Sequence, residues 1–234
     1  MKHLLKNGCL ALMLIALFSC NVDSSNFTLK GKIKGLKKGV VYLQKEVDTT
    51  IINLDSLEIK GQQEFTLSTN LEEPMVLYLS LQKNDGKEHY VPFFANMGEM
   101  EINTTLDGFN FDADIKGSKQ QDALNQYLKL MKGFNQRNLE LLEENFNAMK
   151  DNNIALSDSL QEASQTLFKR KYATTINFAL NHTDNEIAPY LALYEIPNAT
   201  KKYIDTIYNS LTPEIKASYY GRELKEAMAR RDSL

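Results

Sequence analysis

Glycines and lysines alternate along one short stretch in a pattern that could cradle phosphate. Gly31, Gly35 and Gly39 recur every fourth position with lysines between them. A phosphate-binding loop needs Gly-x-x-x-x-Gly-Lys and then Ser or Thr entering a helix, so that backbone N–H groups and the helix dipole converge on the anion. The flanks here alternate as strands do, which favours a lysine-rich hairpin whose lysines protect a sheet edge. Contact with anionic lipid headgroups is the functional alternative.

A second group of polar residues offers oxygen atoms that calcium could use. Asp107, Asn110, Asp112 and Asp114 lie close together in the sequence. Calcium needs about six to eight oxygens on a tightly turned loop, and the regular Asp-x-Asp-x-Asp-Gly run is missing. Because Asp112 and Asp114 alternate with apolar residues, the pattern favours a solvent-facing strand edge. We expect neither a metal nor a cofactor.

Residues typical of hydrolytic and zinc sites are scarce. Beyond residue 19 the histidines are His89 and His182, one in each half of the chain and each in a loop context. The sequence has neither a His-Glu-x-x-His zinc motif nor a Gly-x-Ser-x-Gly nucleophile elbow. Paired carboxylates of the glycosidase type stay open, because their pairing is spatial. A hydrolase of glycan or ester substrates is therefore kept as an alternative, and no catalytic residue is assigned.

Aromatic side chains in the first half of the chain allow two interpretations. Tyr42, Tyr78, Tyr90, Phe93 and Phe94 could line a ligand groove, since binding clefts are often aromatic. The same residues at strand spacing are more often the core of a β-sandwich. The sequence favours the core and leaves the groove as the alternative.

A single cysteine follows the apolar segment at the N-terminus. Lys2 and Lys6 precede an uncharged run, Leu10 to Phe18, which is too short to span a hydrocarbon core about 30 Å thick and has the length of a secretory signal. The run ends in Leu17-Phe18-Ser19-Cys20. This tetrad resembles the lipobox of bacterial lipoproteins. The resemblance implies cleavage before Cys20, a diacylglycerol thioether on its sulfur and acylation of the new amine.

The same resemblance predicts where the protein is held. Residues 1–19 would be removed as a signal peptide, and residues 20–25 would form a flexible polar tether. Two or more acyl chains at Cys20 would give stable anchoring in the cell envelope, on the periplasmic face or at the outer membrane. An uncleaved anchor with an incidental cysteine is the alternative. Cys9 lies within the segment that is removed.

Composition excludes several classes of function. The chain has 234 residues and a formal net charge of −3, and loss of Lys2 and Lys6 makes it two units more negative. A mildly acidic chain argues against a nucleic-acid partner, which needs a basic surface. After Cys20 there is no other cysteine, so the mature protein would have no disulfide, no thiol nucleophile and no thiolate metal site. Packing alone must then stabilise the fold.

Periodicity divides the mature chain into two domains. Residues 26–117 alternate apolar and polar side chains in short runs between turns, which predicts an antiparallel β-sandwich of about seven or eight strands. Within it, the turn at Gly61 should close a hairpin, and Pro92 should lie on an edge strand or at a bulge. From residue 118 apolar residues recur at helical spacing, which predicts a helical domain over residues 118–234. The expected fold class is α+β.

Two long helices are expected at the start of the helical domain. Ser118 and Gln121 match a capping box for the first, whose apolar stripe should continue to Met149. Ser159 and Glu162 match a capping box for the second. Shorter helices should follow, and all of them must pack on one another or on the sandwich.

The order of short motifs along the chain resembles a known family. The motifs are Phe27 to Ile33, Asp55-Ser56-Leu57, Gly61 to Phe65, Glu73-Pro74, Gly117-Ser118 and Tyr219 to Lys225. They resemble a domain of unknown function, with the segment after it, that forms the N-terminal part of thiol:disulfide interchange lipoproteins related to TlpA. In those relatives a thioredoxin-like domain with Cys-x-x-Cys comes next, whereas this chain stops at Leu234. The resemblance therefore implies the scaffold and carries over no redox residue.

Together these patterns predict a lipid-anchored envelope lipoprotein that acts as a non-enzymatic binding or interaction module. The expected partners are the membrane, through Cys20, and a protein of the envelope. The first alternative is an accessory of a periplasmic thiol–disulfide redox pathway that acts through a separate thioredoxin-like protein. The hydrolase named above is the second.

Overall fold

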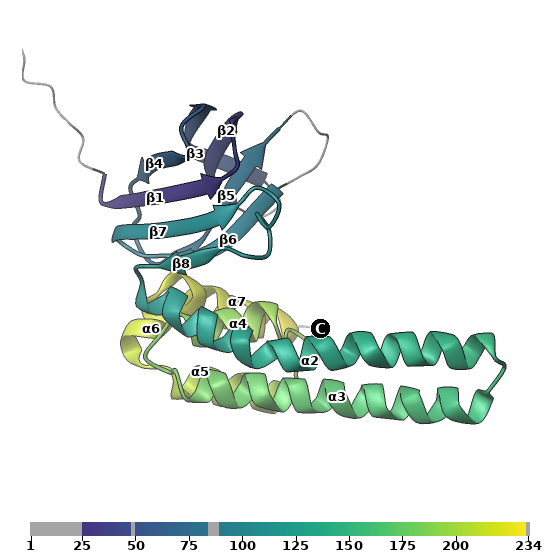
Figure 1. Cartoon of the computed structure of the whole chain (residues 1–234). Coiled ribbons are helices and arrows are strands. Elements are labelled where there is room, and N and C mark those ends of the chain that lie inside the picture. The colour runs from purple at the N-terminus through teal and green to yellow at the C-terminus, as the bar shows by residue number, and fades with distance from the viewer. Residues whose placement is uncertain (1–24, 48–49, 84–88, 233–234) are drawn as a thin grey trace, which may run out of the picture.

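The computed structural model describes residues 25–47, 50–83 and 89–232, in which strands come first and helices follow (Figure 1). The strands end at Lys116 and the helices begin at Lys119, so the predicted α+β class is confirmed. The predicted signal peptide, the predicted lipidation site Cys20 and residues 20–24 of the predicted tether lie outside the described residues. Among the described residues, no helix combines the length and the apolar composition needed to cross a membrane.

In the described part of the chain, eight strands form two sheets of four. In spatial order the first sheet contains β4 (Glu64–Thr69), β1 (Phe27–Lys34), β7 (Gly98–Thr105) and β8 (Asp114–Lys116). The second contains β3 (Thr50–Lys60), β2 (Lys38–Val47), β5 (Met75–Gln82) and β6 (His89–Ala95). The described pairs are antiparallel, as predicted, except that β1 runs parallel to β7.

The two sheets share one hydrophobic core. Every second residue of β1 is buried, and the alternate positions face solvent, as period-two alternation requires. Buried side chains of β1, β4 and β7 join those of β2, β5 and β6 in a single cluster. Phe27 of the first sheet and Phe93 of the second stack with ring centroids 6.3 Å apart. The core therefore lies between the sheets, and each sheet keeps an outer face.

The turns between strands cross from sheet to sheet more often than the sequence suggested. β3 pairs with β2 while β4 pairs with β1, so the turn at Gly61 does not close a hairpin. The glycine- and lysine-rich turn before β2 also joins different sheets. The lysines of this stretch protect no sheet edge, because β1 and β2 are each paired on both sides. Lys30 and Lys32 of β1 instead form ion pairs with the neighbouring strands. Alternation predicts a strand but not its partner. Pro92 lies on the edge strand β6, as expected.

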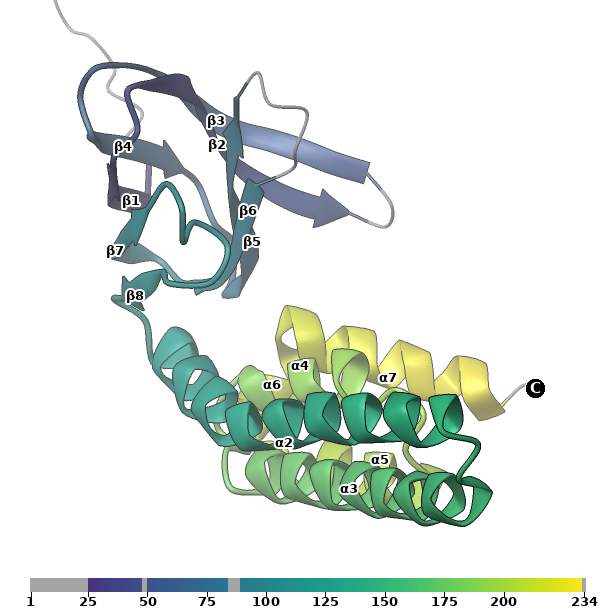
Figure 2. The same cartoon turned by 45° about the vertical axis from the view of Figure 1, so that its right-hand side comes forward.

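Six described helices follow the strands. They are α2 (Lys119–Lys150), α3 (Ile154–Leu180), α4 (Ile187–Tyr194), α5 (Lys201–Ser210), α6 (Pro213–Ala217) and α7 (Tyr219–Asp232). The first two lie side by side (Figures 1 and 2), and their outer half projects beyond the others as an arm in the view of Figure 1. The Ser118 hydroxyl accepts from the Gln121 N–H at 3.0 Å, which confirms Ser118 as the N-cap, while the Gln121 side-chain oxygen accepts from Phe94 of β6. The second predicted cap is wrong: Asn153 caps α3, and Ser159 lies inside it.

The predicted apolar stripe of α2 packs in its first half only. Leu124, Tyr127 and Met131 are buried, and the Tyr127 hydroxyl bonds to Thr175 of α3.

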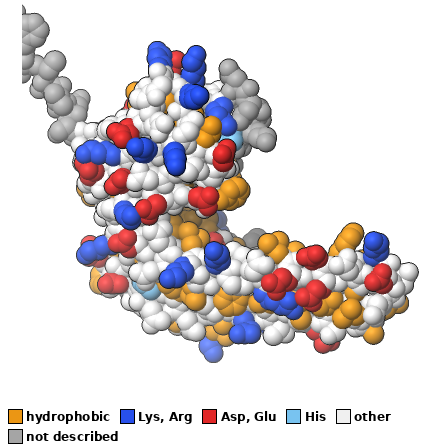
Figure 3. Space-filling model, in the orientation of Figure 1, with side chains coloured by type: hydrophobic (Ala, Val, Ile, Leu, Met, Phe, Trp, Pro, Cys, Tyr) orange, Lys and Arg blue, Asp and Glu red, His pale blue; other side chains and the backbone are white. Residues whose placement is uncertain are grey.

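In the second half a different row of the helix faces α3. Leu141 and Ala148 are buried in a small cluster with Leu160 of α3, whereas Phe146 is 69% exposed and Met149 is also exposed. Figure 3 shows hydrophobic side chains along this arm. Two apolar rows run along the same helix, and periodicity alone could not say which of them meets a neighbour.

The helices are fastened to the end of the second sheet. The Phe94 N–H donates to Gln121 Oε1 at 2.7 Å, and its carbonyl accepts from the Ser118 hydroxyl at 2.7 Å. The Phe94 ring lies edge-on to Tyr190 of α4 and Tyr220 of α7. One strand residue thus contacts three helices through both its backbone and its ring.

Two of the short motifs in the sequence meet at the same junction. Glu73, before β5, forms an ion pair with Arg222 and accepts a hydrogen bond from the Tyr219 N–H. The Tyr220 hydroxyl accepts from the Val76 N–H at 2.9 Å. Residues nearly 150 positions apart therefore join the start of α7 to the start of β5, and this fixes the helices relative to the second sheet.

Candidate functional site

The outer face of the second sheet is covered at one end and open at the other. Alternate residues of a strand share a face, so Tyr90, Pro92 and Phe94 of β6 all lie on the outer side. Phe94 is fully buried under α2, α4 and α7, whereas Tyr90 is 50% exposed. The helices cover only the end of the sheet near Phe94. The uncovered end is the candidate site.

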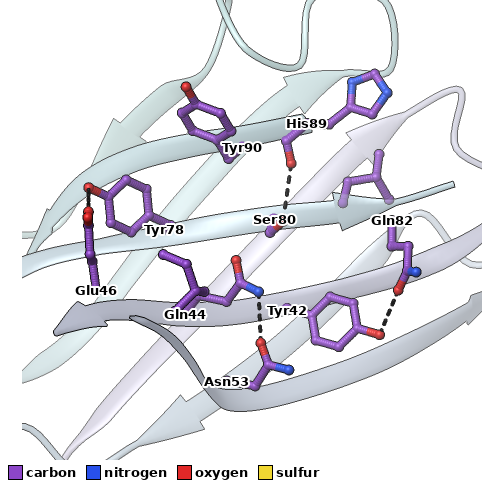
Figure 4. Close-up of a pocket in the computed structure, with 11 residues that line it drawn as sticks. Tyr42, Gln44, Glu46, Asn53, Tyr78, Ser80, Gln82, His89 and Tyr90 are labelled. Carbon is purple, nitrogen blue, oxygen red and sulfur yellow. Dashed lines mark hydrogen bonds between the residues drawn. The ribbon is translucent and has the colours of Figure 1, made fainter. Parts of the chain in front are cut away.

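The open end forms a groove of about 610 Å³ lined by tyrosines and polar side chains (Figure 4). We call it the tyrosine groove. It lies across four strands, and no lysine or arginine is among its described lining residues. The residues that line it are Tyr42, Gln44, Glu46, Ile51, Asn53, Tyr78, Ser80, Leu81, Gln82, His89 and Tyr90.

Strand register explains why this face is hollow. Tyr42 of β2 lies opposite Ser80 of β5, and Ser80 lies opposite Tyr90 of β6. Neighbouring strands are about 4.8 Å apart, so the two tyrosines are separated by roughly 10 Å with a serine between them. Figure 4 shows Tyr42, Tyr78 and Tyr90 arranged around Ser80. The small side chain of Ser80 therefore forms a floor between larger walls.

The polar side chains of the groove are held by one another. Gln44 Nε2 donates to Asn53 Oδ1 at 2.7 Å, and the Tyr42 hydroxyl donates to Gln82 Oε1 at 2.9 Å. An amide carries two N–H donors and an oxygen with two lone pairs. These bonds thus orient three amides and use only part of the capacity of each, so all three amides can bond a ligand without giving up the bonds that position them.

Tyr78 stays protonated at every physiological pH. Its hydroxyl donates to Glu46 Oε2 at 3.2 Å. Burial and then the nearby Glu46 carboxylate raise the pKa of Tyr78 to about 12, because both disfavour the phenolate. The ring of Tyr78 is therefore a neutral wall, edge-on to Tyr90 with centroids 6.2 Å apart.

The tyrosine groove continues towards the helices. Glu46 and Tyr78 also line an adjoining pocket of about 210 Å³, whose other walls include Tyr190 and Tyr194 of α4 and Glu223 of α7. Burial raises the pKa of Tyr190 to about 12 and also raises the pKa of Tyr194. An aromatic surface therefore runs from the open sheet face to the junction with the helices.

The structure divides the five aromatic residues noted in the sequence. Phe93 lies in the core between the sheets, as favoured. Phe94 is also buried, but on the outer face under the helices and not in the sandwich core. The core interpretation is wrong for Tyr42, Tyr78 and Tyr90, which lie on the outer face and line the groove. A signal for this was available: each tyrosine occupies the opposite strand parity from the buried aliphatic residues beside it.

The other polar residues considered in the sequence do not come together. Asp114 lies on the exposed edge strand β8 and forms an ion pair with Lys116 at 2.6 Å, as a strand-edge carboxylate would; Asp112 lies in the turn before it. His89 begins β6 and lines the tyrosine groove, while the His182 ring stacks on Phe178 in the helical part. Within the described ranges, no three histidine, cysteine, aspartate or glutamate residues are grouped so as to hold a metal ion.

The strand-rich part of the chain matches a known protein family. Residues 27–124 match a family described as a domain of unknown function, DUF4369. The match begins with β1 and ends in the first turns of α2, so it includes every strand of the tyrosine groove. The match covers less than half of the chain, and the helices from α3 onwards lie outside it. No curated protein matches the sequence.

Proposed function

We propose that this chain, which matches DUF4369 over residues 27–124, is a lipid-anchored lipoprotein of the bacterial cell envelope that acts as a non-enzymatic binding module. The lipid on Cys20 would hold the folded part on the membrane, and the tyrosine groove would bind the ligand. The tyrosine groove is the observation that carries the proposal. A sheet face that only met water would not need three tyrosines around a hollow.

The chemistry of tyrosine supports a binding role. Its ring offers a large apolar contact surface with few rotatable bonds to immobilise, and its hydroxyl can bond at the same time. The volume of the groove, about 610 Å³, lies within the roughly 300–1,000 Å³ of ordinary ligand sites. Glu46 is the single carboxylate among the described residues that line the groove, and Glu223 joins it only in the adjoining pocket. A glycosidase needs two carboxyl groups facing one sugar unit, so the groove itself suits binding better than hydrolysis.

Replacing Cys20 with alanine should release the protein from the membrane. Without the thiol no diacylglycerol thioether can form, so the variant should be found soluble or unprocessed, whereas the unchanged protein should sediment with membranes. Fractionation and intact-mass measurement check this, and the membrane-bound form should begin at Cys20 and carry acyl groups. Cys9→Ala is the matched control, because Cys9 lies in the removed segment and its loss should change neither result. A Cys20→Ala protein that is still cut and membrane-bound would refute the anchor.

Occupancy of the groove can be measured without knowing the ligand. Hydroxyl-radical footprinting should modify Tyr90 less in native membranes than in the purified full-length protein, because a bound ligand shields an exposed ring. Tyr203 of α5 is the internal control: it is 47% exposed, lies outside the groove and should react equally in both samples. Equal reactivity of Tyr90 in the two samples would count against the tyrosine groove as the binding site.

A further inference from the structure

The chemical class of the ligand follows from what the groove offers and what it lacks. We infer that the tyrosine groove binds a neutral oligosaccharide that crosses the strands from Tyr42 over Ser80 to Tyr90. This inference rests on the proposed binding function and specifies its ligand. Four features of the groove narrow the class of ligand that it can bind: its charge, its hydrogen-bonding groups, its shape and the pairing of its strands.

The charge of the groove argues against an anionic ligand. The described lining residues include one carboxylate, Glu46, and no lysine or arginine. Phosphate and sulfate groups are bound by cationic side chains or by converging backbone N–H groups. A nucleotide, an anionic lipid headgroup or an acidic glycan would instead meet the Glu46 carboxylate without compensation. The ligand should therefore carry no net negative charge.

The polar groups of the groove suit a ligand rich in hydroxyls. Gln44, Asn53 and Gln82 present planar amides, each with donors and acceptors, and Glu46 adds a strong acceptor. A sugar hydroxyl donates and accepts at once, so neighbouring hydroxyls can bond one amide through both its oxygen and its nitrogen. The bonds from Gln44 to Asn53 and from Tyr42 to Gln82 hold these amides in place before a ligand arrives. Little further ordering is then needed on binding.

The rings suit the apolar faces of the same ligand. A pyranose ring has faces of C–H groups with hydroxyls around the rim, and the C–H groups pack against the electron-rich face of an aromatic ring. Tyr42 and Tyr90 lie roughly 10 Å apart, two strand spacings, on either side of Ser80. Two aromatic contacts separated by a polar hollow fit a chain of sugar units better than a single compact molecule.

A peptide ligand fits this face less well. Strand addition would place a peptide beside an edge strand, β3 or β6, and not across the groove, where β2 and β5 are each paired on both sides. A docked helix needs a continuous apolar trough, whereas amides and Glu46 interrupt this one. A proline-rich segment also uses aromatic grooves, and it is the peptide class that the experiment must include.

The inference predicts binding of neutral sugars that depends on the rings. Full-length protein in detergent micelles would be titrated calorimetrically with short gluco-, manno-, galacto- and N-acetylglucosamine oligomers, with polygalacturonate, and with a proline-rich peptide. At least one neutral oligomer should bind, with little dependence on salt because no ion pair forms. Tyr42→Ala and Tyr90→Ala should each weaken that binding on the order of tenfold or more, the scale of a lost stacking contact.

Matched variants separate stacking from folding. Tyr90→Phe keeps the ring and should bind within about threefold of the unchanged protein if stacking dominates. Ser80→Leu should fill the floor and abolish binding while Tyr42 and Tyr90 remain. Tyr203→Ala removes an exposed tyrosine elsewhere and should bind normally, and equal thermal melting would show that each variant is folded.

The outcomes also separate the ligand class from the proposed function. The bound oligomer should shield Tyr90 of the purified protein from hydroxyl radicals, as the natural ligand should in native membranes. Binding of the peptide or polygalacturonate alone, or of no probe, would refute the neutral-sugar inference, and shielding in native membranes would still uphold the binding function. Cleavage of a bound oligomer would uphold the ligand class and refute the non-enzymatic proposal.

Discussion

Replacing Phe94 with alanine should lower the free energy of unfolding by about 3–5 kcal/mol, the usual cost of removing a fully buried phenylalanine ring. The ring is 0% exposed and lies edge-on to Tyr190 and Tyr220, with centroids 5.6 and 5.5 Å away. Both of those rings are held by other contacts, so they cannot collapse fully into the space. The cavity would lie where three helices meet the second sheet.

Chemical denaturation measures this effect, and Phe111→Ala is the matched control. Phe111 is 88% exposed in the turn before β8, so truncating it should change stability by no more than about 0.5 kcal/mol. The Phe94 backbone bonds to Ser118 and Gln121 survive the substitution, which isolates the contribution of the ring. If both variants lost the same small amount, the junction would not depend on Phe94.

Gly221→Ala should destabilise the protein by about 2–3 kcal/mol, although alanine is ordinarily the better helix former. A Cβ at this position would press into the Ile215 carbonyl oxygen of α6 and lie 2.8 Å from the Lys216 carbonyl oxygen, inside the 3.0 Å limit of real contacts. Both obstacles are backbone, so α6 or α7 must move as a unit, and such overpacking costs about 1–3 kcal/mol or more. Movement of α7 would also disturb the contacts that Tyr220 and Arg222 make with the sheets.

Gly133→Ala is the matched control for Gly221→Ala. Gly133 lies inside α2, and a Cβ there would meet nothing within 4 Å. The same substitution should therefore stabilise the protein by about 0.5–1 kcal/mol, through helix propensity alone. Thermal or chemical denaturation should show opposite signs for the two variants. If both variants lost stability to the same extent, or if neither did, the close approach of α6 would not be the reason that position 221 requires glycine.

Local sequence patterns were sufficient to predict the strands and helices, but not to predict which of them pair or pack together. Alternation in residues 27–116 predicts strands, because burial on one face of a sheet requires it. The change to helical spacing at residue 118 predicts in the same way that helices follow. The pairing of β4 with β1 rather than with β3 depends on contacts far apart in the sequence, which no turn motif specifies. The same limit explains Phe146: a second apolar row on α2 is visible in the sequence, but its exposure depends on where α3 lies.

The amino-acid sequence by itself determined which side chains share a face. Tyr90 and Phe94 belong to one side of β6, and Phe93 to the other, because side chains alternate along any strand. The tertiary structure alone decided what each face meets. Contacts of Glu73 and Val76 with α7 hold the helices over one end of the second sheet, so Phe94 is buried while Tyr90 stays open to a ligand. Burial is a property of neighbours brought together by folding, and no local spacing of residues encodes it.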